Sequence, residues 1–173
     1  MITFKHSLLC VAMACIVTSC GKAEAPRAST TEVIELALSD VPQSVNELVS
    51  TTRPDFTTTE VLKKVREGRV YYDVEGELTN GEEIEFDVLM TENGPQIVEI
   101  QRDINWNFVP LLAQTIVQRA NPDGLEIVRI IESIQTDNSI IYEVFVANHP
   151  SEPRFEVRMK DNEAKLLPTR WKH

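Results

Sequence analysis

Cysteine and histidine supply most nucleophilic and zinc sites, and this chain places few of them where they could act. All three cysteines, Cys10, Cys15 and Cys20, lie in the first twenty residues. Beyond that stretch the histidines are His149, which precedes a proline, and His173. A Ser-His-Asp site would have to use one of these histidines, and a zinc site would need both of them with carboxylates. We therefore expect no catalytic residue, no metal ligand set and no cofactor.

The densest charge pattern flanks Asn80-Gly81, a pair typical of hairpin turns because both residue types tolerate positive φ. Acidic residues alternate along both flanking segments and should share one outward face: Asp73, Glu75, Glu77, Glu83, Glu85 and Asp87. Like charges that face each other destabilise a sheet, so something must offset them. Three ways of offsetting this repulsion remain open. They are solvent together with preceding cations (Lys63, Lys64, Arg66, Arg69), a basic partner protein, or a weakly bound divalent cation.

A second candidate surface lies in the later half of the chain. Alternation predicts that Ile141 and Phe145 point outward on one strand, beside Arg154 and Arg158 on the next. Exposed apolar side chains among arginines are typical of protein interfaces. The alternative is that the apolar pair packs against the first half of the chain or against Trp171. The acidic face of one molecule could also meet this basic set on another, giving a dimer or a chain of molecules.

The net charge argues against nucleic acid as the main partner. The 173 residues carry a formal charge of −10, whereas phosphate binding needs a basic face. Residues 40–103 hold 15 acidic and 6 basic side chains, but residues 104–173 hold 9 and 8. The two halves should therefore present different surfaces.

Hydrophobic periodicity predicts two short helices, each followed by strands. Val41, Val45, Leu48 and Val49 form one helical stripe, and the second helix repeats it at residues 109, 112, 116 and 117. Ser39-Asp40 and Asn107 are suited to cap these helices. Strands are expected at residues 58–66, 69–78, 83–91 and 96–100, and then at 125–134 and 139–147.

The two halves repeat one pattern. Phe86, Val88 and Met90 recur as Phe155, Val157 and Met159 at an offset of 69. Val41-Pro42 recurs as Val109-Pro110, and Tyr72 with Val74 recurs as Tyr142 with Val144. The chain is therefore predicted to use one module twice, at residues 32–103 and 104–173.

The repeated pattern resembles the PepSY-like domain, and two such units in tandem resemble the fold of β-lactamase inhibitory protein and its relatives. The motifs that carry the likeness are Val41-Pro42, Gly68, Tyr72-Asp-Val74, Gly81, Phe86-Asp-Val88, Gly94 and Ile97. The resemblance implies an α+β fold of two helix-plus-antiparallel-sheet units, with the helices packed on one face of the sheets. It also implies a periplasmic or secreted location and the binding or restraint of other proteins, proteases in some members, and it supplies no catalytic residues. The second copy departs from the pattern, since residues 148–153 replace the Asn-Gly turn and Glu163 stands in place of Gly94.

The N-terminus resembles a bacterial lipoprotein signal. An apolar run at residues 8–17 ends in Val17-Thr-Ser-Cys20, which is similar to a lipobox. That likeness implies removal of residues 1–19 and acylation of Cys20, with residues 20–31 as a flexible tether. An ordinary secretory signal or an N-terminal membrane anchor is the alternative. Gly21, rather than Asp, after the cysteine favours the periplasmic side of the outer membrane over the inner membrane.

These features together predict a lipid-anchored periplasmic protein that binds another envelope protein, with inhibition of a protease or other envelope enzyme as one form of that binding. The partner-binding candidates are Ile141, Phe145, Arg154, Arg158, Asp73, Glu75, Glu83, Glu85 and Asp87. Two alternatives remain: a structural or assembly lipoprotein of the outer membrane, and an acidic cation-binding module.

Overall fold

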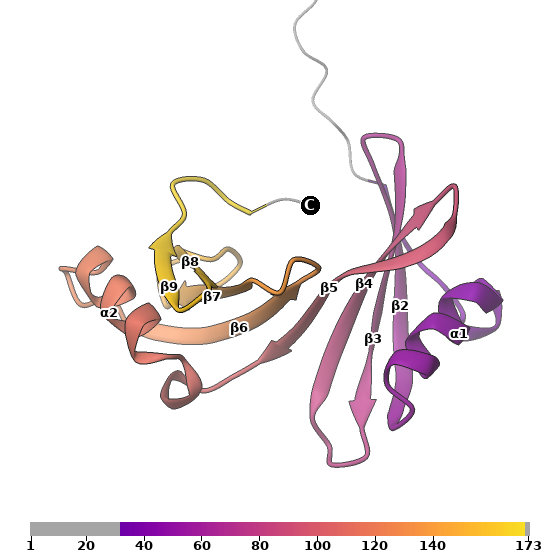
Figure 1. Cartoon of the computed structure of the whole chain (residues 1–173), viewed down its shortest axis with the longest axis horizontal. Coiled ribbons are helices and arrows are strands. Elements are labelled where there is room, and N and C mark those ends of the chain that lie inside the picture. Colours follow the sequence, from indigo (N-terminus) through magenta and orange to yellow (C-terminus); the bar gives the residue numbers. More distant parts are fainter. Residues whose placement is uncertain (1–31, 172–173) are drawn as a thin grey trace, which may run out of the picture.

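The computed structural model describes residues 32–171 and shows a single antiparallel sheet of nine strands, arranged in chain order (Figure 1). Within these residues no helix is both long enough and apolar enough to cross a bilayer. The strands are β1 (Glu32–Glu35), β2 (Phe56–Arg66), β3 (Arg69–Leu78), β4 (Glu83–Thr91), β5 (Gly94–Asp103), β6 (Ile127–Gln135), β7 (Ile140–Val146), β8 (Phe155–Lys160) and β9 (Glu163–Leu166). The helices are α1 (Gln43–Thr52) and α2 (Leu111–Ala120), preceded by the 3₁₀ turns η1 (Leu38–Asp40) and η2 (Trp106–Phe108).

The prediction of two helix-plus-sheet units is wrong, because the strands of both halves join in one sheet. The later part of β5 pairs with β6, from Glu99 opposite Gln135 to Asp103 opposite Ile131. Strand β5 is longer than expected from its sequence, running to Asp103, and its extra residues supply this pairing. An internal repeat shows that two segments are alike, but it carries no information on whether their edge strands pair.

Both helices cover the same face of this sheet, and we call the opposite side the second face. On the helix side, α1 packs with Val74, Phe86 and other residues of β2–β4, and the rings of Phe56 and Phe86 meet edge-to-face at 5.0 Å. Near the other end of the sheet, α2 packs with Val144, Val157 and their neighbours. In Figure 1 the sheet curves between the two helices, and the C-terminal segment reaches back between its two ends.

The helix starts differ from expectation. Pro42 and Pro110 occupy the N-cap positions, and no side-chain hydrogen bond caps either helix, contrary to the roles expected of Ser39-Asp40 and Asn107. Those polar residues lie inside the 3₁₀ turns η1 and η2, before the N-cap position of each helix, so they cannot cap it. On α2 the buried positions are Ala113 and Val117, while Leu112 is 52% exposed, so its predicted place in the buried stripe is wrong.

Candidate protein-binding face

Six acidic side chains lie on the second face of β3 and β4, as the alternation predicted. The register sets Asp73 opposite Asp87 and Glu75 opposite Glu85, and a third pair, Glu77 and Glu83, follows at the hairpin end. The chain turns at Asn80-Gly81 as expected, within residues 79–82, and of the two residues only Gly81 has positive φ (80°). The predicted ends of both strands are confirmed, and with them the pairing of like charges. We call these six residues the acidic row.

One of the expected counter-ions is present at one end of the acidic row. Lys64 of β2 forms an ion pair with Asp73, whose side chain is buried. Arg66 and Arg69 lie over the ring of Tyr71, at 4.7 and 5.2 Å from its centroid. The prediction that cations of the preceding strand offset the acidic residues is therefore confirmed for Lys64 with Asp73.

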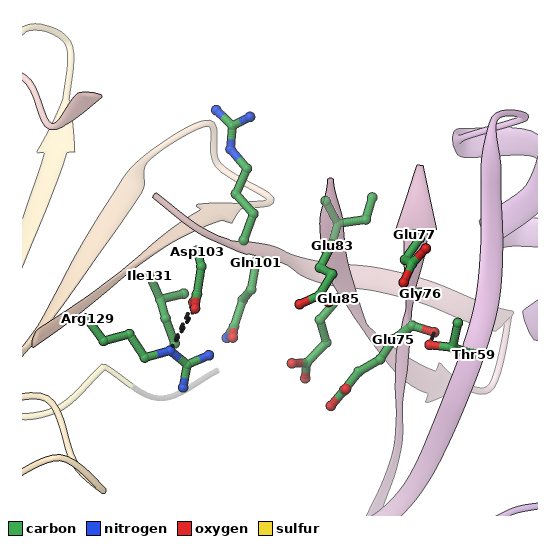
Figure 2. Close-up of a pocket in the computed structure, with 12 residues that line it drawn as sticks. Thr59, Glu75, Gly76, Glu77, Glu83, Glu85, Gln101, Asp103, Arg129 and Ile131 are labelled. Carbon is green, nitrogen blue, oxygen red and sulfur yellow. Dashed lines mark hydrogen bonds and ion pairs between the residues drawn. The ribbon is translucent and has the colours of Figure 1, made fainter. Parts of the chain in front are cut away.

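The other end of the acidic row lines a cleft of about 240 Å³ that opens on the second face (Figure 2). Its acidic lining consists of Glu75, Glu77, Glu83, Glu85 and Asp103, and its cations are Arg102 and Arg129. The close-up shows Glu75 and Glu85 reaching toward the same space from adjacent strands, with Arg129 and Asp103 across from them.

Both arginines at the cleft are bound to other carboxylates. Arg129 donates from Nε to both oxygens of Asp103 at 3.0 Å. Arg102 donates to Glu82 and Glu132, at 2.6 Å each. Within residues 32–171 the structure gives no ion pair to Glu75, Glu77, Glu83 or Glu85. The cleft therefore concentrates negative charge that the described chain does not neutralise.

Glu85 bears the largest electrostatic cost in the cleft. Burial, and after it the nearby charge of Asp87, raise the pKa of its carboxyl to about 7, while Lys64 acts in the opposite direction. A desolvated carboxylate beside like charges is held in its ionised form by any cation that enters. The arrangement therefore favours a positively charged ligand.

Three carboxylates of the acidic row also meet one condition for a metal site. Oxygens of Asp73, Glu85 and Asp87 lie within 4.8 Å of one another. Hard cations such as Ca²⁺ prefer oxygen ligands, but they need six to eight of them. Lys64 already approaches the same Asp73 carboxylate, so the protein supplies its own cation at this position.

Of the two interpretations of Ile141 and Phe145, the exposed protein interface is wrong, and burial, which the alternative expected, is confirmed. Ile141 is 0% exposed and Phe145 is 5% exposed, with the Arg129 guanidinium 5.5 Å from the Phe145 ring. Arg154 is exposed near the start of β8, and Arg158 forms an ion pair with Asp137 at 2.6 Å. Alternation correctly placed the apolar pair opposite the helix side, but it could not show that other parts of the chain cover them.

Two features of the second face were missed by the sequence reasoning. Glu99 of β5 accepts hydrogen bonds from Ser133 and from Gln135 (2.7 Å) of β6, and all three residues are buried. The indole of Trp171 donates to Gln135 at 2.9 Å. The first feature depends on the β5–β6 pairing and the second on the return of residues 167–171 over the sheet, and no local pattern signals either.

No protein-family model matches the chain, and no curated protein matches it. The PepSY-like resemblance, the absence of enzymatic activity and the envelope location therefore stay predictions. Cys20 and His173 lie outside the described residues, and His149 is exposed in the turn after β7.

Proposed function

We propose that this protein is a lipid-anchored protein of the bacterial envelope that binds a basic segment of another protein in the cleft on the second face of its sheet. The single observation that carries the proposal is the set of four cleft glutamates, for which the described residues provide no ion pair. Inhibition of an envelope enzyme is one use of such binding. A membrane anchor through Cys20 would hold this surface near the periplasmic side of the outer membrane.

Charge complementarity supports a protein rather than a nucleic acid as the partner. The cleft lies in the part of the chain with the largest acidic excess, 15 acidic against 6 basic residues over positions 40–103. Partly enclosed walls strengthen electrostatic attraction toward an opposite charge. A lysine or arginine side chain could enter a cleft of this volume and replace the missing counter-ions.

The proposal is tested by a photo-crosslinking amino acid at Glu83, an exposed cleft residue, in living cells. The matched control is Glu47, an exposed glutamate on α1, on the opposite side of the sheet. We expect one protein to be trapped from Glu83 and not from Glu47. Its yield should fall when Glu75 and Glu85 are changed to Gln. Equal trapping at both positions, or none at Glu83, would contradict the proposal and favour a structural role.

A divalent-cation module is a second candidate, favoured by the proximity of the Asp73, Glu85 and Asp87 carboxylates. A cation bound to the native state raises the midpoint of thermal unfolding, whereas a partner-binding surface gains little from Ca²⁺. A midpoint that rises by several degrees with millimolar Ca²⁺, and does not rise in Glu85→Gln, would support the cation module. We expect no such rise, since Lys64 already pairs with Asp73.

A further inference from the structure

The chain folds its own C-terminal segment, residues 167–171, back over the second face of β6–β8. In Figure 1 this segment leaves β9 and ends between the two arms of the curved sheet. The sheet residues that it contacts are Gln135, Glu156 and Arg158, on the side opposite the helices. The second face therefore has two regions: an open acidic cleft over β3–β6 and a covered region over β6–β8.

Trp171 is held on the covered region by polar contacts at both ends of the residue. Its backbone N–H donates to the Glu156 carboxylate at 2.6 Å, and its indole N–H donates to Gln135 at 2.9 Å. The Arg158 guanidinium lies 5.4 Å from the Trp171 ring, a cation–π distance. Glu156 is 8% exposed and Gln135 is 6% exposed, so the groups that hold Trp171 are buried parts of the sheet.

Arg170 supplies a positive charge to the same region. Its guanidinium lies 3.1 Å from Glu152 and 3.9 Å from Glu156. Burial, together with the charges of Glu99 and Glu156, raises the pKa of neighbouring Glu143 to about 7, and Arg170 opposes that rise. The covered region therefore offers carboxylates that pair with a guanidinium. It also offers the side-chain oxygen of Gln135, which accepts a hydrogen bond from an indole N–H.

The attachment of this segment is local and lies at the end of the described chain. Leu167 adds one backbone hydrogen bond to Glu156, after which the segment is irregular. Arg170 is 44% exposed, and Trp171 is only half-buried. Terminal segments with few bonds and exposed ion pairs open at low free energy. Such a segment can be exchanged for another of the same chemistry.

We propose that the second face of β6–β8 is a binding site for a protein segment in which an arginine directly precedes a tryptophan, and that Arg170-Trp171 occupies this site in cis. The inference rests on the proposed function only in that the acidic cleft and this second site lie on the same face of the sheet. It adds that the covered region recognises an arginine followed by a tryptophan, and that a partner must displace residues 167–171 to bind there.

The test uses the full-length Trp171→Ala variant, in which the site is vacated, and a fluorescein-labelled peptide with the sequence of residues 167–171. The tethered segment competes at a millimolar effective concentration. We therefore expect the peptide, followed by fluorescence anisotropy, to bind the variant at least about tenfold more tightly than the wild type. Binding should weaken at least about fivefold when Glu156→Gln is added to the variant, because a charge-assisted contact is lost. Glu163→Gln on β9 is the matched control and should leave binding unchanged.

Three results would overturn the inference: no saturable binding to Trp171→Ala, equal binding to variant and wild type, or unchanged binding of a peptide whose tryptophan is replaced by alanine. A chain that ends after residue 167 replaces the variant if Trp171→Ala fails to fold by circular dichroism. Peptide binding without crosslinking at Glu83 would reject the proposed function and keep this inference. Crosslinking at Glu83 without peptide binding would reject this inference and keep the proposed function.

Discussion

At the scale of single residues, Glu85 is the side chain at which stability and binding oppose each other. It faces Glu75 across the strand pair and lies beside Asp87, with Lys64 and Glu99 also acting on it. Burial and like charges both penalise its ionised form. In the proposed function, a cationic ligand would remove this penalty by stabilising the ionised carboxylate.

The raised pKa of Glu85 leads to a pH-dependence prediction. Its carboxyl has a pKa of about 7 in the folded chain against an ordinary value of 4.5. Between these two values the unfolded chain has released the proton and the folded chain still holds it, so the free energy of unfolding should fall as the pH rises. Glu85→Gln should raise the free energy of unfolding by about 1–3 kcal/mol at pH 8 and leave it unchanged at pH 4.

This prediction is checked by urea unfolding of wild type and variant at several pH values. Glu47→Gln on α1 is the control and should change the free energy of unfolding by less than about 0.5 kcal/mol at every pH. Glu143 also has a raised pKa of about 7, so part of the pH dependence should survive in Glu85→Gln. An identical pH dependence in wild type and Glu85→Gln would disprove the role of Glu85.

At the scale of elements, the close pairing of β2 with β3 shapes one wall of the cleft. Gly76 faces β2 beside an irregularity in the pairing between Thr58 and Glu60. A Cβ added at Gly76 would overlap the carbonyl oxygen of Thr57 and the ring of Phe56. Phe56 in turn packs edge-to-face on Phe86 in the core. This glycine therefore allows the two strands and the core to approach, and the cleft residues Glu75 and Glu77 flank it.

Gly76→Ala should lower the free energy of unfolding by about 3 kcal/mol, because the new methyl group must displace backbone or a packed ring. The comparison is Gly68→Ala, where nothing lies within 4 Å of the added Cβ and only the positive φ of 77° opposes the change. That variant should lose roughly 1–2 kcal/mol. Chemical denaturation of both variants checks the order, and a larger loss at Gly68 would show that the close approach at Gly76 is not tight.

At the scale of the whole molecule, one curved sheet brings two charged surfaces together. The open acidic cleft and the covered region under residues 167–171 both lie on the second face. Both helices lie on the other face and leave the cleft open. A partner could thus contact the cleft and the covered region at once, which would couple binding at one to release of the C-terminal segment at the other.

Attachment to the membrane is the prediction that belongs to the whole protein. Cys20→Ser should remove the acylation site and shift the protein from the membrane fraction to the soluble periplasmic fraction, because multiple acyl chains are needed for lasting attachment. Cys15→Ser is the control and should leave the protein in the membrane fraction, since the likeness to a lipoprotein signal implies that this residue is removed before Cys20 is acylated. Cell fractionation and intact-protein mass spectrometry check both outcomes. Retention of Cys20→Ser in the membrane after removal of residues 1–19, or an unacylated wild-type protein, would contradict the lipoprotein prediction.

Local patterns in the sequence were enough to determine most strands and both helices. The bounds of β3 and β4 follow from alternation, and their register from the Asn80-Gly81 loop, so the acidic row could be predicted. Hydrophobic spacing found Val45 and Val49 on α1. These features depend on residues close in the chain, where the periods of helix and strand act directly.

Only the tertiary structure decided how distant segments meet. The β5–β6 pairing makes one sheet out of two similar halves, because free strand edges pair wherever their lengths and positions allow. That pairing also brings Arg129 to Asp103 at the cleft. Ile141 is buried by contacts outside its own strand, and alternation defines only which face a side chain occupies. Whether that face is open depends on where the C-terminal segment lies.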